Sequence, residues 1–185
     1  MAQSQGLIEQ TTSTIQHWES HLKELLNAAS PTSKVAIVGI GHPFRGDDYV
    51  GSYVLKGIIS VTGNRLSDSV YLFDAEDNVE RVITKLSRIG PKQVIFIDAC
   101  EMGVRPAETK LMAIDETDYP FFTTHGIPLK VLAQQLLIRC KVWVLAIQPK
   151  DTEFREALSQ EVRDAADYAS EFITSSLTKE GKDIV

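Results

Sequence analysis

The sequence predicts a three-layer α/β/α fold around a central, twisted and mostly parallel sheet of about five strands, one of them antiparallel. Short continuous apolar runs recur along the chain, as expected of strands that are covered on both faces. Segments with helical spacing of apolar residues separate these runs, and this alternation favours a parallel sheet between two helical layers. The 185 residues are long enough to form the core of one such domain.

An N-terminal helical extension is predicted at residues 1–33. Apolar residues recur at helical spacing over residues 8–28, and Pro31 ends the helix. We expect this apolar stripe to dock on the body of the domain, with a partner chain as the alternative. His17 and His21 have a spacing that can bind metal, but no third ligand is near, so exposed polar residues are the simpler interpretation.

A single α/β domain is predicted over residues 34–178, followed by a C-terminal tail at 179–185. Its strands share a short apolar run, and they are expected at residues 35–38, 70–73, 94–97, 109–114 and 142–145. The segment 109–114 directly follows a turn and is the extra strand of the set.

Helices are predicted between these strands, where apolar residues recur at intervals of three and four. They are expected over residues 50–58, over 79–86 with an end at Gly90-Pro91, after Pro128, and after Ser159 as far as 177. Pro128 suits the first turn of its helix, and Ser159 suits a helix N-cap.

The charge balance excludes two classes of partner. A net charge of −6 and a pI near 5.2 are the opposite of what non-specific nucleic-acid binding or attachment to anionic lipid requires. The chain shows neither the start of a secretory signal nor an apolar run of the ~18 residues that a membrane span needs, so a cytoplasmic protein is expected. Cys100 and Cys140 form no disulfide framework or zinc motif, and we expect two buried, reduced thiols.

Three polar residues are expected at the carboxyl ends of the strands, where such sheets bind ligands. Asp48 follows the first strand, Asp98 ends the third, and His125 lies in the loop before Pro128. Two carboxylates and an imidazole suit a divalent transition metal with open positions. Asp48 could instead favour a helix N-terminus, and His125 could be an ordinary loop residue. Asp98 directly follows an apolar strand, where an unpaired carboxylate is costly.

The loop from Gly39 to Asp48 resembles nucleotide-binding loops only in part. Phe44 occupies the third glycine position of the dinucleotide fingerprint, and Asp47-Asp48 stand where a phosphate loop needs Lys and Ser or Thr. Two negative charges at a helix N-terminus repel a phosphate and attract a cation. Phosphate binding is therefore disfavoured.

Four segments, in order, resemble the motifs of the hydrogenase maturation endopeptidases. They are VGIGHPFRGDDYVG at residues 38–51, IDACEMG with the following proline at 97–106, TTHGIPL at 123–129 and AIQP at 146–149. The resemblance runs from about residue 34 to 178. It implies a phosphorylase/hydrolase-like fold, in agreement with the three-layer prediction.

The resemblance also implies a function. Such enzymes remove a short C-terminal extension from the large-subunit precursor of nickel-iron hydrogenase after nickel has been inserted. The metal-contacting positions of the family match Asp48, Asp98 and His125, and the metal that they meet is the nickel of the precursor. The expected partner is therefore this precursor, and the expected enzyme is a hydrolase of aspartic or metal-assisted type that acts as a monomer.

Two mechanisms stay open at this point. Nickel could polarise the scissile carbonyl or a bound water. Alternatively an acid could act as general base, with Asp74 and Glu76 as candidates, although both residues suit the start of the next helix. His42 stands where the family usually has Asn, and it is either a fourth nitrogen ligand or part of the turn. The segment at Asp74 lacks the glycine pair that many members have.

Two other classes of function compete with a processing endopeptidase. One is a non-catalytic α/β module that holds a nucleotide or a metal. The other is a thiol hydrolase that uses Cys100 and His125.

Overall fold

The computed structural model describes residues 18–63, 68–116, 128–154 and 157–178. Within them, the sheet has the strand order β2-β1-β3-β5-β4. The strands are β1 (Val35–Ile40), β2 (Val70–Glu76), β3 (Gln93–Ala99), β4 (Thr109–Ala113) and β5 (Lys141–Ile147). All neighbours pair in parallel except β4, which is antiparallel to β5. The predicted fold class, including its one antiparallel strand, is confirmed.

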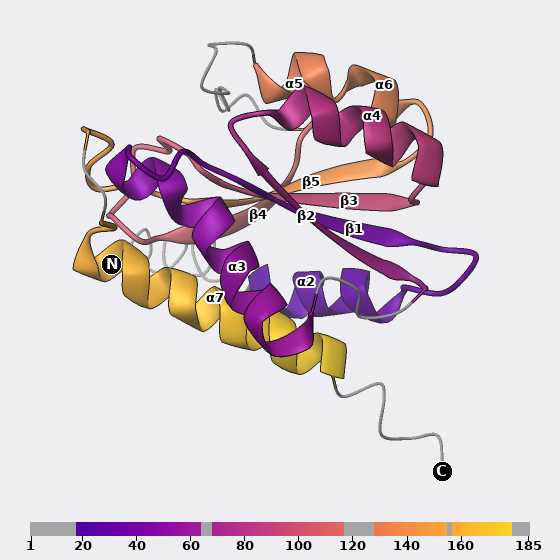
Figure 1. Cartoon of the computed structure of the whole chain (residues 1–185), viewed down its shortest axis with the longest axis horizontal. Helices are drawn as coiled ribbons and strands as arrows, with labels where there is room; N and C mark the ends of the chain where they lie inside the picture. The colour runs from indigo at the N-terminus through magenta and orange to yellow at the C-terminus, as the bar shows by residue number, and fades with distance from the viewer. Residues whose placement is uncertain (1–17, 64–67, 117–127, 155–156, 179–185) are drawn as a thin grey trace, which may run out of the picture.

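Helices cover both faces of the sheet, as Figure 1 shows. One face carries α2 (Trp18–Asn27), α3 (Val50–Thr62) and α7 (Gln160–Thr178), and the other carries α4 (Val79–Ile89), α5 (Leu129–Leu132) and α6 (Gln134–Leu137). Alternate residues of β1 point into the two layers: Val35 and Ile37 enter the first core, and Ala36 and Val38 enter the second. The central strands are therefore apolar without interruption.

The segment after Pro128 differs in detail from the prediction. A continuous helix was expected, but the chain forms two single turns, α5 and α6, with Ala133 between them at ψ near −7°. The apolar side chains of both turns still enter the core beside α4, so the periodicity predicted the buried face correctly.

The N-terminal segment packs on the body of the domain over its described part. Leu22, Leu25 and Leu26 of α2 are buried in the same core as α3 and α7. His21 is half-buried, and its ring contacts the edge of Trp143 with centroids 4.6 Å apart, so it is not the exposed residue that was expected. His17, the rest of residues 1–17 and the tail 179–185 lie outside the described residues, and the bounds of the extension stay a prediction.

The strand order reverses between β1 and β3, and the first turn of α3 lies directly above this point. Gly51 makes the close approach possible: a Cβ there would lie 1.9 Å from the carbonyl oxygen of Ile97 and 2.4 Å from that of Ile40. In sheets of this kind the reversal point is where ligands bind. Gly51 therefore sets how closely α3 packs against the edge of the sheet where polar residues gather.

We expect Gly51→Ala to lower the free energy of unfolding by about 3 kcal/mol or more, because the new methyl group meets two backbone carbonyls that cannot rotate away. Gly57→Ala is the control, since its Cβ would meet only the side chain of Ser170, with the hydroxyl oxygen at 2.4 Å and the Cβ at 3.2 Å, and no backbone atom. That change should alter stability by no more than about 1 kcal/mol. Urea unfolding of both variants measures the difference, and equal stability of the two would contradict the close approach.

Candidate active site

Asp98 is a buried carboxylate at the carboxyl end of β3. It lies beside Ala146 of β5, and only 4% of the residue is exposed. Burial raises the pKa of Asp98 well above its ordinary value, the negative charge of Asp48 raises it further, and a hydrogen bond from the Ala99 backbone N–H partly offsets both effects. The carboxylate is thus kept in an environment that disfavours its charge, as at many functional sites.

Asp48 lies in a short 3-10 helix, η1 (Gly46–Tyr49), in the loop after β1. Its Oδ2 accepts a hydrogen bond from the His42 backbone N–H at 3.3 Å, and its own N–H donates to the carbonyl of Arg45 at 3.1 Å. The short helix η1 packs against β3, and the charge of Asp48 contributes to the raised pKa of Asp98. The structure therefore places Asp48 on the same side of the sheet edge as Asp98, where the strand order reverses.

The third predicted ligand, His125, lies outside the described residues. Within the described ranges, no three His, Cys, Asp or Glu side chains form a group that could hold a metal ion. The Nδ1 of His42 accepts the backbone N–H of Phe44 at 3.2 Å, so this ring at least shapes the turn, and its role as a fourth ligand stays a prediction. The convergence of Asp48 and Asp98 with His125 also stays a prediction.

Asp47 plays a role that the sequence did not reveal. Its side chain is fully buried, and its carboxylate accepts the backbone N–H groups of Lys150 and Asp151 at 2.9 Å, and both the N–H and the hydroxyl of Ser159 at 2.7 and 2.8 Å. Burial raises the pKa of Asp47, but these donors outweigh burial and the net pKa is lowered. Ser159 precedes α7, and its hydroxyl donates to Asp47. Asp47 therefore anchors the loop that carries Asp48 to the start of the last helix.

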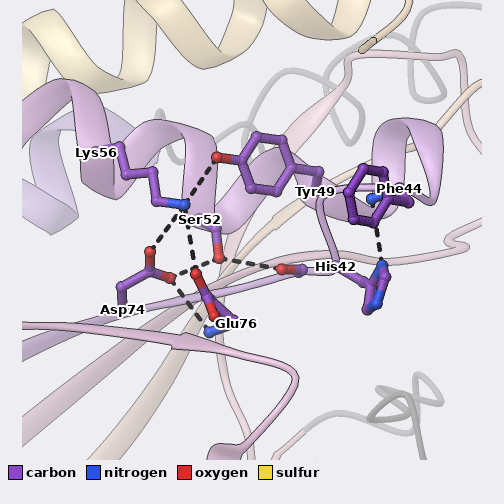
Figure 2. A network of polar contacts seen from close by, with 8 residues as sticks. His42, Phe44, Tyr49, Ser52, Lys56, Asp74 and Glu76 are labelled. Atoms are coloured by element: carbon purple, nitrogen blue, oxygen red, sulfur yellow. Dashed lines mark hydrogen bonds and ion pairs between the residues drawn. The ribbon is translucent and has the colours of Figure 1, made fainter. Parts of the chain in front are cut away.

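Asp74 and Glu76, the alternative general bases, lie at the carboxyl end of β2 and are held by other side chains (Figure 2). The hydroxyl of Ser52 donates to Oδ1 of Asp74 at 2.7 Å. The ammonium of Lys56 lies 3.3 Å from Oδ2 of Asp74 and 3.6 Å from Oε1 of Glu76. Its hydrogen bond to the Tyr49 hydroxyl, together with the charge of Asp74, raises the pKa of Lys56. The ammonium therefore stays charged, and it engages both carboxylates in ion pairs.

Gln148 supports the loop that follows Asp98. It is 3% exposed, its Oε1 accepts the N–H of Met102 at 2.7 Å, and its Nε2 donates to Oε1 of Glu101 at 2.9 Å. Because Gln148 directly follows β5, it ties the end of β5 to the loop after β3. Gln148 directly follows a buried strand, and this position in the sequence is the feature that could have indicated its role. Asp98 has a similar position at the end of β3.

The charge of Asp48 adds to burial in disfavouring the charge of Asp98, and a positive charge beside Asp98 would offset both effects. The nearby ammonium of Lys56 is engaged by Asp74 and Glu76 instead. Carboxylate oxygens suit divalent metals, and a histidine nitrogen would shift the preference towards a transition metal.

Comparison with known proteins points to one family. The family model for HycI, hydrogenase maturation protease, matches residues 61–176, which is more than half of the chain. A Methanocaldococcus jannaschii protein assigned to the hydrogenase maturation proteases is 31% identical over 149 residues, a match that covers 77% of this chain and 88% of that protein. The chain belongs to the hydrogenase maturation protease family. The resemblance seen in the sequence is thereby confirmed.

Other relatives of this protease agree with that assignment. The hydrogenase 3 maturation protease of Escherichia coli K12 is 28% identical over 131 residues, covering 69% of this chain and 81% of that one. The crystal structure of the hydrogenase maturation protease HycI of Thermococcus kodakarensis superposes with a TM-score of 0.73 at 23% identity, over 85% of this chain and 98% of that one. HybD, a hydrogenase-maturating endopeptidase of E. coli, superposes with a TM-score of 0.62 at 15% identity, over 80% of this chain and 94% of that one. These structures confirm the fold.

Among the described residues, none of the protease's helices is both long enough and apolar enough to span a bilayer.

Cys100 is a poor nucleophile for the competing thiol mechanism. The residue is 2% exposed, and burial, followed by the charges of Asp98 and Glu101, raises the pKa of its thiol to about 12. A thiolate is the reactive form, so this thiol is unreactive at neutral pH. Cys140 is half-buried rather than buried, and both cysteines are free thiols.

We therefore expect Cys100→Ala to keep the processing rate of the protease within about twofold of wild type, although losing a buried sulfur should cost about 1 kcal/mol of stability. Treatment of the wild type with iodoacetamide under native conditions should also leave the rate unchanged. A mass-spectrometric processing assay checks both. A loss of activity in both experiments, with the fold intact by circular dichroism, would support the thiol mechanism instead.

Proposed function

We propose that this protease removes the C-terminal extension of a nickel-iron hydrogenase large-subunit precursor, and that it uses the nickel in that precursor as the signal to cleave. Family membership supports the processing activity. The observation that carries the rest is the interaction of Asp48 with the buried Asp98 at the point where the strand order reverses. A cation carried by the substrate is the ligand that this pair favours.

In the proposed complex, Asp48 and Asp98 supply oxygen ligands to the nickel of the precursor, and His125 supplies a nitrogen ligand. Bound nickel would supply Lewis acidity at the scissile carbonyl or at a water molecule. The protein contributes the carboxylates of Asp48 and Asp98, whose negative charge is compensated only when the substrate brings the cation. A precursor without nickel leaves the charge of Asp98 disfavoured by burial and by Asp48, which is why cleavage would wait for metal insertion.

Asp98 is also the better candidate for a general base or acid, should proton transfer be needed. Burial, together with the charge of Asp48, raises the pKa of Asp98 above that of an ordinary carboxyl, and a carboxyl with a raised pKa holds its proton more readily for transfer. Asp74 and Glu76 are disfavoured for that role because both are paired with Lys56. The proposed mechanism is therefore metal-assisted, with Asp98 at its centre.

The test compares two forms of the same large-subunit precursor, one loaded with nickel and one free of metal. We expect a discrete loss of mass from the C-terminus of the loaded precursor only. Asp98→Asn and His125→Ala should both abolish this loss while the circular dichroism spectrum is retained. Equal cleavage of both forms would contradict the nickel signal, and cleavage of neither would contradict the processing activity.

A further inference from the structure

Lys56 of α3 lies at the centre of a polar network beside the candidate active site (Figure 2). Its ammonium donates to the Tyr49 hydroxyl at 3.0 Å and lies within salt-bridge distance of Asp74 and Glu76. The side chain is about half exposed, at 47%. An isolated ion pair on the surface contributes little to stability. A network whose members belong to the site can, however, fix the positions of the site residues.

The first connection from Lys56 to the site passes through Tyr49. This residue directly follows Asp48 in η1, so fixing its side chain limits how the short helix can turn. The ammonium also lies 5.1 Å from the centroid of the Tyr49 ring, which adds a cation–π contact to the hydrogen bond. Lys56 therefore holds the neighbour of Asp48 in two ways.

The second connection passes through Asp74 and Ser52. The single hydroxyl proton of Ser52 faces two acceptors, Oδ1 of Asp74 at 2.7 Å and the carbonyl oxygen of Gly41 at 3.2 Å, so the serine oxygen lies between these two groups. The next residue, His42, donates its backbone N–H to Oδ2 of Asp48. This connection reaches the Asp48 carboxylate from the other side of the loop.

The same lysine also stabilises a strained residue. Glu76 has a φ of 49°, a left-handed conformation that is unfavourable for a residue with a side chain. Its carbonyl accepts the N–H of Gly41 at 2.9 Å, its own N–H donates to Asp74 Oδ1 at 3.2 Å, and its carboxylate pairs with Lys56. The end of β2 and the loop before Asp48 are therefore held by one connected set of contacts.

We infer that Lys56 is a positioning residue that holds the Asp48 carboxylate in its place in the active site, an inference that rests on the proposed function. Without the ammonium, Asp74 and Glu76 repel each other, and Asp74 no longer holds Ser52 against Gly41. The Tyr49 hydroxyl loses its hydrogen bond from the Lys56 ammonium at the same time. Both connections to Asp48 then fail, and its carboxylate becomes mobile relative to Asp98.

The kinetic test uses Lys56→Met, which keeps the length of the side chain without its charge, and Lys56→Arg, which keeps the charge. We expect Lys56→Met to lower kcat/KM at least about tenfold and Lys56→Arg to restore most of it. Lys85→Met, which removes an exposed lysine from α4 on the other face of the sheet, is the control and should match wild type. Wild-type kinetics for Lys56→Met would overturn the inference.

A double-mutant cycle separates positioning from a direct effect on the precursor. Asp48→Glu keeps a carboxylate but shifts it by one methylene, so it should retain measurable residual activity. In that background Lys56→Met should cost much less than tenfold, because the carboxylate it holds is already displaced. The same fold loss in both backgrounds would show that Lys56 acts independently of Asp48, which would overturn the inference.

A measurement on the free protein needs no substrate. The amide hydrogen of His42, which bonds to Asp48, should exchange with solvent faster in Lys56→Met than in wild type or Lys85→Met, as followed by NMR. Unchanged exchange would overturn the positioning role even if Lys56→Met processes the precursor more slowly than wild type. If wild type cleaves no precursor, the proposed function fails, and the exchange result still decides whether Lys56 positions Asp48.

Discussion

Asp98→Asn is expected to abolish precursor processing and, at the same time, to stabilise the free protein. The native structure disfavours the charge of this carboxylate through burial and through Asp48, and asparagine removes that charge with almost no change in shape. The free energy of unfolding at pH 7 should therefore rise, because asparagine removes a charge that the native site disfavours. Few substitutions at a buried polar residue are expected to be stabilising, so the result is diagnostic.

The pH dependence of this gain has a definite sign. A carboxyl whose folded pKa is raised binds its proton more tightly in the native state than in the unfolded state, so its contribution to stability falls as pH rises above about 3.9, the ordinary value. The difference between Asp98→Asn and wild type should therefore be small below that pH, grow as pH rises, and level off above the folded pKa. Urea unfolding at a series of pH values measures it.

Asp48→Asn is the matched control for Asp98. It removes the neighbouring carboxylate from a half-buried position, so processing should be lost with a smaller change in stability. A destabilised Asp98→Asn, or one that still processes the precursor at the wild-type rate, would contradict the assignment of Asp98 as a functional acid.

Asp47→Ala is expected to have the opposite effect, although Asp47 is the immediate neighbour of Asp48. The change leaves three backbone N–H groups and the Ser159 hydroxyl without their acceptor in a buried position. Leaving buried donors unsatisfied costs about 1–3 kcal/mol each, and we expect a total loss of at least about 3 kcal/mol. Differential scanning calorimetry or urea unfolding gives the value.

The stabilisation by Asp47 also depends on pH, with the opposite sign to that of Asp98. Its folded pKa is lowered, so its contribution is complete above the ordinary carboxyl pKa and is lost as pH falls through the folded pKa. Asp48→Ala is the control and should cost much less, because the Asp48 side chain accepts one hydrogen bond of 3.3 Å from the described residues. Equal destabilisation by the two alanine variants would contradict the anchoring role of Asp47.

The strands and the two polar strand ends could be predicted because they depend on local patterns. The apolar run at residues 94–97 is typical of a covered strand, and an acid that directly follows such a run is expected at the edge of the sheet. The position of Asp98 at the end of β3 was thus predicted from its neighbours in sequence, whereas its role stays a prediction. Asp48 was found because it follows the first such run across a glycine-bearing loop.

The roles of Asp47 and Lys56 could not be predicted, because their partners are distant in sequence or hidden by helical periodicity. Asp47 contacts residues that lie 103 to 112 positions later, and no local pattern reports such contacts. Lys56 falls on the polar side of α3, so from the sequence it resembles an ordinary solvated lysine. Its ion pair with the end of β2 is visible only in the structure. For the same reason Asp74 and Glu76 could be read as general bases from sequence, whereas the structure shows both paired.

The tether from Asp47 to Ser159 has a consequence for the biosynthesis of this enzyme. The acidic pair is encoded in the first hundred residues, but the loop that presents Asp48 gains its anchor only when residues 150–159 are available. A nascent polypeptide whose last helix is still inside the ribosomal exit tunnel therefore lacks that anchor. The Asp48 loop can therefore reach its anchored state only after residues 150–159 have left the ribosome.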